Sequence, residues 1–410
     1  ISMSTKLSEE LKWRGLVGLT TIDDLTTLDQ PGAFYFGADP SADSMTIGNL
    51  AGLVTCLRFI RAGYKAIFLA GGATGRAGGD PDGKDETRTK LDEATIKRRV
   101  GLLQQQAKWI LRDTDLVTVD NYDWFQQINY IDFLRDIGWH FSMTQLLDRD
   151  FVQKRIGAGG KGINYAEFSY SLIQGYDFLH LYRTHGVTLQ LCGVDQFGNC
   201  TSGMRMVDKL EGARVDVFGI PLVINKSTGK KFGKSEGGAV WLDSAKTSVY
   251  QFYQFWLNVD DLGVVDYLKV YTFLSREEIG ELEAQQQAHP EARPAQRRLA
   301  EEVTKLVHGE AALAKVQRVT EVLFGGRAVS ELDSDELDLL SAEIKTVELT
   351  SELTVSRALL AGGVASSNGE ARRLIQGGGV SVNGVKLTTD QPLDRCSLIR
   401  KGKNRFVLVR

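Results

Sequence analysis

Residues 231–235 read Lys-Phe-Gly-Lys-Ser and contain two lysines, one on each side of a glycine. Two ammonium groups and several backbone N–H donors can converge there on the oxygens of a polyphosphate. A solvated basic turn is the simpler interpretation of so short a motif. Thr46-Ile47-Gly48-Asn49 offers similar chemistry, because it stands at the predicted start of a helix, where N–H groups and the helix dipole favour anions. Capping of that helix explains the same residues equally well.

A second candidate site consists of three polar residues at helical spacing. Tyr170, Gln174 and Asp177 stand at i, i+4 and i+7, so they share one face of a helix. A helix beside a sheet normally buries an apolar face there. An enclosed polar ligand explains this trio better than packing does, because a buried polar group without a partner costs free energy.

The elements that position these residues are predicted from apolar runs and turn signals. The first half of the chain shows strand, helix, strand and glycine-rich loop over residues 33–36, 47–62, 66–70 and 71–81. This is a βαβ unit with its ligand edge at the strand carboxyl ends. A second strand, helix and strand follow at residues 187–191, 198–210 and 215–223, and residues 121–185 between the halves are mainly helical. The fold class is therefore α/β, with a Rossmann-like parallel sheet.

Composition is typical of a soluble globular protein. The chain has 410 residues, of which 42% are hydrophobic and 25% charged, and it has no apolar run of membrane-spanning length. The four cysteines form no C-x-x-C pair, so neither a disulfide framework nor a zinc site is indicated. We expect a cytoplasmic protein, or one from an organelle matrix if a transit peptide has been removed.

Four regions are expected along the chain. These are a Rossmann-like catalytic domain at 1–246, an α-helical domain at 247–325, an acidic linker at 326–350 and a small unit at 351–410. The small unit has ten Lys/Arg against four Asp/Glu, a net charge of +6, whereas the whole chain carries −3. A basic module on an acidic body suggests a polyanionic partner. Within it, Asn383-Gly384 predicts a β-hairpin.

Taken together, the motifs resemble a known family. Residues 39–49 and 231–235 resemble the two signatures of class I aminoacyl-tRNA synthetases. The whole chain is similar to the bacterial-type tyrosyl-tRNA synthetases, since further matching segments follow in the family's order at 71–75, 121–124, 133–138, 170–178, 195–199 and 231–243. Residues 351–410 resemble the α+β S4-type RNA-binding domain that closes these enzymes.

The resemblance implies a role for individual residues. Tyr35 and Asp177 match residues that hydrogen-bond the phenol hydroxyl of tyrosine, and the rest of the tyrosine-binding set is Asp80, Tyr170, Gln174, Gln190 and Gln196. The ATP-binding set is Gly37, Asp39, Ser41, Gly48, Gly193, Asp195, Phe232, Gly233 and Ser235. Residues implied to support the departing phosphates are Thr46, Asn49, Lys84, Arg88, Lys231 and Lys234. Candidate RNA contacts are Arg357, Arg372, Arg373, Lys386, Lys401 and Lys403.

The implied reaction has two steps, in which tyrosine and Mg-ATP give tyrosyl-adenylate and the tyrosyl group then passes to tRNA. Positioning and electrostatic stabilisation should supply most of the rate. The five histidines lie outside the motifs, so no histidine-based catalysis is expected. No permanently bound metal and no membrane partner are expected. The resemblance also implies a homodimer that uses residues 121–185, especially 133–141.

Several residues depart from the family pattern. Thr46 and Asn49 replace the two histidines usual in the tyrosyl signature, and Cys192, Val194 and Phe197 alter the adenosine pocket. Two alternatives to a tyrosine–tRNA ligase follow. One is a ligase for tryptophan, which the Tyr35/Asp177 pair and the S4-like tail disfavour. The other is a paralogue retained as an RNA-binding protein with weakened aminoacylation, which the loss of both histidines motivates.

Overall fold

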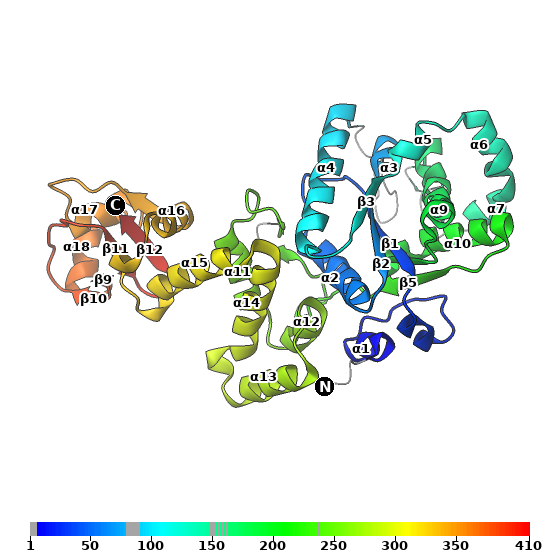
Figure 1. Ribbon diagram of the computed structural model, residues 1–410. Coiled ribbons are helices and arrows are strands. Elements are labelled where there is room, and N and C mark those ends of the chain that lie inside the picture. Colours follow the sequence, from blue (N-terminus) through cyan, green and yellow to red (C-terminus); the bar gives the residue numbers. More distant parts are fainter. Residues whose placement is uncertain are drawn as a thin grey trace. The chain divides into compact units, whose positions relative to one another are not determined.

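The computed structural model describes residues 6–78, 91–147, 152–153, 156–157, 159–160, 162–235 and 238–410, and the chain divides into two compact units (Figure 1). The first unit comprises Ile1–Thr247 and Phe255–Leu299, and the second comprises Ser248–Gln254 and Ala300–Arg410. The α-helical region expected at 247–325 is therefore not one unit, because most of its first half packs with the catalytic part. No helix in the described ranges is long and apolar enough to cross a membrane.

A five-stranded parallel sheet forms the centre of the first unit. Its strands lie in the order β3-β2-β1-β4-β5, and they span Val117–Asp120, Lys65–Ala70, Ala33–Ala38, Leu189–Gly193 and Asp216–Ile220. The Rossmann-like prediction is confirmed. The strand order reverses between β1 and β4, which pair directly through Tyr35 and Gln190. Ligands of open α/β sheets bind at the carboxyl ends of the strands at such a reversal.

Helices cover both faces of this sheet. Figure 1 shows α2 (Ile47–Arg61) and α4 (Glu93–Ile110) on one side, and α9 (Tyr165–His185) and α10 (Phe197–Glu211) on the other. Alternation along β1 explains the two cores. Phe34 packs on Phe59 of α2, with ring centroids 5.6 Å apart, whereas Tyr35 points to the opposite face and packs on Phe178 of α9 at 5.3 Å.

The remaining elements of the first unit are mostly helical. The glycine-rich loop expected after residue 70 forms the short helix α3 (Gly72–Arg76), and the strand β3 was not predicted. The predicted helical region between the two halves contains α5 (Tyr122–Phe125), α6 (Tyr130–Asp136), α7 (Met143–Leu147) and α9. After the sheet come α12 (Val264–Tyr271) and α13 (Arg276–Ala288), and α1 (Leu7–Trp13) precedes it.

The second unit contains a five-stranded mixed sheet in the order β10-β9-β11-β12-β8. The strands span Val385–Leu387, Val380–Val382, Ser397–Lys401, Arg405–Val409 and Lys345–Val347. Asn383 and Gly384 both have positive φ at the β9–β10 turn, as the Asn-Gly signal requires. The helices of this unit are α15 (Glu310–Thr320), α16 (Ser334–Glu343), α17 (Val355–Ala361) and α18 (Asn368–Gln376), and α11 (Val249–Leu257) and α14 (Pro294–His308) each cross the unit boundary.

Residues 326–350, expected to be a linker, belong to this fold. They supply α16, whose first turn is capped by Asp333, and β8, which pairs in parallel with β12. Leu340 of α16 is fully buried against Leu408 of β12 in a shared hydrophobic cluster. The acidic composition suggested a linker, but the buried leucines provide an apolar face, and this face packs into the fold.

Candidate active site

A cavity of about 500 Å³ opens at the carboxyl ends of β1 and β4. Most of the residues predicted for tyrosine, for ATP and for the departing phosphates line it: Tyr35, Gly37, Asp39, Ser41, Thr46, Gly48, Asn49, Tyr170, Gln174, Asp177, Gln190, Gly193, Asp195, Gln196, Lys231 and Phe232. Gly233 adjoins Ile47 without lining the cavity, and Lys234 and Ser235 are described only through their backbone in β6 (Lys234–Ser235). Asp80, Lys84 and Arg88 lie outside the described residues.

The buried end of the cavity contains Tyr35 and Asp177. The hydroxyl of Tyr35 is buried and has no hydrogen-bond partner among the described residues. Asp177 is 2% exposed, and its two carboxylate oxygens accept hydrogen bonds from Asn121 Nδ2 at 3.1 Å and Trp124 Nε1 at 3.0 Å. Burial raises the pKa of the Tyr35 phenol and, against the opposing effect of these two hydrogen bonds, the pKa of the Asp177 carboxyl.

This pair can recognise a ligand hydroxyl. Tyr35 can donate a hydrogen bond to it, and the Asp177 carboxylate can accept one from it. One bound hydroxyl could therefore form a hydrogen bond with each of the two side chains. A ligand that lacks the hydroxyl would leave the Tyr35 hydroxyl buried without a partner, which is costly, and would leave Asp177 with only its hydrogen bonds from Asn121 and Trp124. The arrangement therefore favours a phenol over a plain phenyl ring.

Asn121 and Trp124 were not predicted as site residues, although their segment contributed to the family resemblance. Both follow β3, a strand that the sequence patterns did not indicate. Trp124 also stacks on His180 of α9, with ring centroids 4.3 Å apart and an interplanar angle of 17°. A predicted β3 would have placed Asn121 at a strand carboxyl end, close to the site, which is the signal that was missed.

A second polar region of the cavity surrounds Gln174 and Gln190. The amide oxygens of both side chains are buried and have no partner in the described part of the chain, while Gln174 Nε2 lies 3.3 Å from the thiol sulfur of Cys200. Two unpaired acceptors in one cavity fit a ligand that carries N–H donors, such as an ammonium group. Nearby, Tyr170 Oη donates to Asp39 Oδ2 at 3.0 Å.

The third region joins the two polyphosphate motifs. Thr46 forms an antiparallel bridge with Trp241, and the backbone N–H of Ile47 donates to the carbonyl of Val240 at 3.1 Å. Gly233 has φ +114, and a Cβ there would lie 3.2 Å from the Ile47 side chain. The motif at 231–235 therefore lies directly against the start of α2.

The helix start is less open than the sequence suggested. The Ile47 N–H is already bonded, and Asn49 Oδ1 accepts from the backbone N–H of Thr46 at 3.0 Å and from its hydroxyl at 3.1 Å. Thr46 and Asn49 thus cap α2 and line the cavity at the same time. The capping interpretation and the binding interpretation are compatible, because the Asn49 amide nitrogen is left as a donor.

The outer end of the cavity is charged and exposed. Lys231 Nζ lies 3.4 Å from Asp195 Oδ2, and the two side chains are 58% and 45% exposed. An ion pair this exposed contributes only about 0–1 kcal/mol. A ligand with phosphate and hydroxyl groups can therefore separate the two side chains at little cost.

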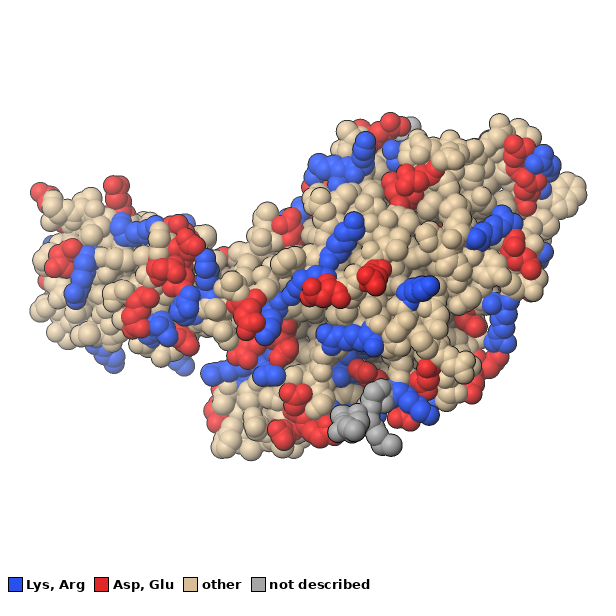
Figure 2. Space-filling model, viewed as in Figure 1, with Lys and Arg blue, Asp and Glu red and all other residues tan. Residues whose placement is uncertain are grey.

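The candidate RNA contacts lie in the second unit, and most of them are exposed: Arg357, Arg372, Arg373, Lys386 and Lys403. Lys401 is different, because its ammonium group donates to the Val364 carbonyl at 3.0 Å and pairs with Glu370 at 3.5 Å. Figure 2 shows basic and acidic side chains interspersed on the visible face of this unit. On that face the net positive charge is not gathered into one basic surface.

Two family models match the chain. One, described as tRNA synthetases class I (W and Y), matches residues 27–325, and the other, described as a tyrosine–tRNA ligase SYY-like C-terminal domain, matches residues 336–409. The chain is 43% identical over 421 residues to the tyrosine–tRNA ligase of Bacillus caldotenax, with 98% of this chain and 99% of that protein covered. The tyrosine–tRNA ligase of Latilactobacillus sakei is 41% identical, with 100% of both chains covered.

A solved structure is also similar. The C-terminally truncated mitochondrial tyrosyl-tRNA synthetase of Aspergillus nidulans superposes with a TM-score of 0.70 at 27% identity, and the match covers 79% of this chain and 95% of that one.

Proposed function

We propose that this chain, which belongs to the class I tRNA synthetases (W and Y), is a tyrosine–tRNA ligase. The observation that carries the proposal is the buried pair of Tyr35 and Asp177, which together can donate to and accept from one ligand hydroxyl. Relatives at 41–43% identity over the full length carry the same name. These comparisons do not favour the tryptophan ligase or the catalytically weakened RNA-binding paralogue.

In the first step, a carboxylate oxygen of tyrosine attacks the α-phosphorus of ATP, and pyrophosphate leaves. Tyr35 and Asp177 hold the phenol, while Gln174, with Tyr170 and Asp80, receives the amino group. Asp195 accepts from the ribose hydroxyls once Lys231 turns to the phosphates. Thr46, Asn49, Lys84, Arg88 and Lys234 complete the support for the leaving pyrophosphate. Mg²⁺ enters with ATP, since this ion is held largely by substrate phosphates and water.

In the second step, the terminal ribose hydroxyl of tRNA attacks the carbonyl carbon of tyrosyl-adenylate and AMP leaves. Neither step requires a covalent bond to the protein, so binding geometry and charge stabilisation must supply the rate. The second unit would bind tRNA through Arg357, Arg372, Arg373, Lys386 and Lys403. Lys401 is better placed to brace the domain, given its contacts with Val364 and Glu370.

The homodimer has support from an apolar surface on the expected segment. Tyr130, Ile131, Trp139 and Met143 are each more than half exposed, and Trp139 is 84% exposed. Clustered exposed apolar side chains often mark a protein interface. Sedimentation should show a dimer that Trp139→Asp dissociates, and a monomeric unaltered chain would contradict this. The cytoplasmic location, based on unpaired cysteines, stays a prediction.

The decisive experiment is amino-acid-dependent exchange of pyrophosphate into ATP. We expect exchange with tyrosine and not with tryptophan or phenylalanine, followed by tyrosine transfer to tRNA. Exchange with tryptophan would support the other specificity. A folded protein without exchange would support the RNA-binding alternative.

A further inference from the structure

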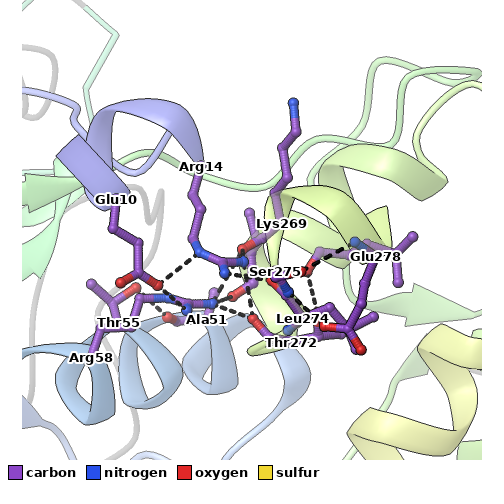
Figure 3. Close-up of polar contacts among 12 residues, drawn as sticks. Glu10, Arg14, Ala51, Thr55, Arg58, Lys269, Thr272, Leu274, Ser275 and Glu278 are labelled. Atoms are coloured by element: carbon purple, nitrogen blue, oxygen red, sulfur yellow. Dashed lines mark hydrogen bonds and ion pairs between the residues drawn. The ribbon is translucent and has the colours of Figure 1, made fainter. Parts of the chain in front are cut away.

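Two buried arginines lie where α1, α2 and α12 meet in the first unit (Figure 3). Arg58 is on α2, the helix whose first residues line the part of the cavity proposed to bind phosphates. Arg14 directly follows α1. Their side chains are 1% and 4% exposed, and Nη1 of Arg58 and Nε of Arg14 both contact Glu10 Oε1, at 3.0 and 2.9 Å. Two buried cations thus share one carboxylate, whose own side chain is 27% exposed. Burial lowers the pKa of Arg58 to about 9, so its guanidinium stays charged near neutral pH.

The arginines cap the carboxyl end of α12. Arg58 Nη2 donates to the carbonyls of Lys269, Val270 and Thr272 at 3.2, 3.2 and 2.6 Å. Arg14 donates to Lys269 and Thr272 at 2.9 and 3.2 Å, and to Leu274 at 2.7 Å. The last carbonyls of a helix lack intrahelical partners, and cations are favourable there. Figure 3 shows Arg14 and Arg58 extending from two different segments, with their guanidinium groups close together beside these carbonyls.

The helix that they hold touches both phosphate motifs. The Tyr267 ring of α12 stacks on Phe232, with centroids 4.3 Å apart and an interplanar angle of 27°. Phe232 directly follows Lys231. Tyr271, also on α12, donates its hydroxyl to the carbonyl of Ile47 at 3.2 Å in a buried contact, and its ring lies 6.0 Å from that of Phe232. One short helix therefore packs against the lysine loop and against the first residue of α2.

This arrangement attaches α12 to α2 at two places. Tyr271 contacts α2 at Ile47 and Arg58 extends from α2 eleven residues later, which corresponds to about 16 Å along the helix axis. On α12 both attachments lie at residues 269–272, so they fix the carboxyl end of this helix relative to α2. A purely stabilising junction would not need charges, because apolar side chains in place of a buried ionic cluster are often as stable or more stable. The several N–H donors of a planar guanidinium group instead fix the orientation of the carbonyls that they bind, and so the orientation of this end of α12.

We propose that Arg58, together with Arg14 and Glu10, is a positioning residue for adenylate formation, because it fixes α12 and thereby the place of Lys231 relative to the start of α2. The inference rests on the proposed function and concerns only its first step. Tyrosine contacts Tyr35 and Asp177 on other elements, so its binding should not depend on this cluster. The expected signature is a loss of kcat without a matching change in tyrosine KM.

The test compares pyrophosphate exchange by the full chain carrying Arg58→Met, Arg58→Lys, Tyr271→Phe or Arg61→Met. Arg61 is the matched control, because it is also on α2 and lies over the Phe273 ring at 3.7 Å, as Arg58 does at 4.5 Å, whereas the hydrogen bonds described to the α12 carbonyls come from Arg58 and Arg14. We expect Arg58→Met to lower kcat about tenfold, since small displacements far from the chemistry can cost up to about a hundredfold. Arg58→Lys should recover part of the rate, and Tyr271→Phe should show the same pattern more weakly.

Unfolding in urea, measured in parallel, separates a rate effect from loss of folded protein. If Arg58→Met does not fold, Tyr271→Phe decides, because it removes only one hydroxyl. Normal kcat in the folded Tyr271→Phe and Arg58→Met variants would overturn the inference, and so would a rise in tyrosine KM as large as the fall in kcat. The absence of exchange by the unaltered chain would instead contradict the proposed function itself.

Discussion

The two ends of the cavity are built from different kinds of structure. At the end proposed to bind tyrosine, called here the tyrosine end, Tyr35 comes from a central strand and Asp177 from a long helix, and both side chains are almost fully buried. At the end proposed to bind the phosphates of ATP, called here the phosphate end, Thr46 and Lys231 come from a helix start and a loop, and Lys231 is more than half exposed. The tyrosine end is enclosed and has a buried hydroxyl without a partner among the described residues, whereas the phosphate end is open and has an exposed, weak ion pair between Lys231 and Asp195.

The difference follows from what each end must distinguish. To distinguish a phenol from a phenyl ring, a site needs buried polar groups whose lack of a hydrogen-bond partner costs free energy. Such groups must be held in place by rigid elements. Binding polyphosphate requires charge that reaches the ligand and releases the product, which suits exposed side chains. Substitutions at the tyrosine end should therefore change specificity and KM. Those at the phosphate end should change kcat.

The largest effect is expected for Asp177→Ala. It removes the proposed acceptor for the tyrosine hydroxyl and leaves the buried donors of Asn121 and Trp124 unpaired. We expect kcat/KM for tyrosine-dependent exchange to fall by about a thousandfold, or about 4 kcal/mol. Near-normal exchange would contradict the assignment of this end. Asp177→Asn, which keeps the size of the side chain, tests whether the carboxylate rather than its volume is required.

A smaller effect is expected at the opposite end. Lys231→Ala should lower kcat about a hundredfold, the usual cost of removing one donor to developing charge, while tyrosine KM changes little. The free energy of unfolding should hardly change, because the ion pair with Asp195 is exposed. Lys230→Ala, at the exposed neighbouring position, is the matched control. A defect confined to tyrosine KM would show that the loop has another role.

Tyr35→Phe should raise tyrosine KM about tenfold and narrow the preference for tyrosine over phenylalanine, because one of two hydroxyl contacts is lost. Its stability should stay the same or rise, since the removed hydroxyl has no partner in the described structure. Tyr64→Phe makes the contrast, because the Tyr64 hydroxyl donates to the Leu28 carbonyl at 3.0 Å. That variant should lose about 1 kcal/mol of stability and keep normal exchange. Lower stability in Tyr35→Phe would contradict this account.

The smallest effect concerns pH. Burial raises the pKa of Asp177 despite the hydrogen bonds from Asn121 and Trp124, and the charges of Asp39 and Asp120 add to the rise. As pH falls through this raised pKa, the carboxyl gains a proton and ceases to be a full acceptor. Tyrosine KM should therefore increase at a higher pH than an exposed aspartate would cause. In Asp177→Asn this rise of tyrosine KM at low pH should disappear. If the rise persists, another group causes it.

Local patterns predicted much of what positions the site. The spacing of Tyr170, Gln174 and Asp177 places all three side chains on the cavity side of α9, because the helical period alone determines which residues share a face. The strand, helix and strand at residues 33–70 and the Asn383-Gly384 turn also formed as predicted. Each of these predictions depends on residues close together in the sequence.

Other features could not be predicted because they depend on distant contacts. The strand β3 and its neighbours Asn121 and Trp124 were missed, and residues 345–347 were expected to be linker but pair with β12. Predicting these strands requires knowing which apolar faces pack together in the fold. The composition of a short segment does not show this.

By itself, the sequence predicted the residues proposed to do the chemistry, their order along the chain and most of the elements that carry them, because side-chain types and local periodicity are read directly. Only the tertiary structure decided that Gly233 lies against Ile47, that Asp177 is held by Asn121 and Trp124, and that Arg58 caps α12. These contacts join residues from about fifty to more than two hundred positions apart. Their formation depends on how whole elements pack, and the free energy of that packing is shared by many side chains at once.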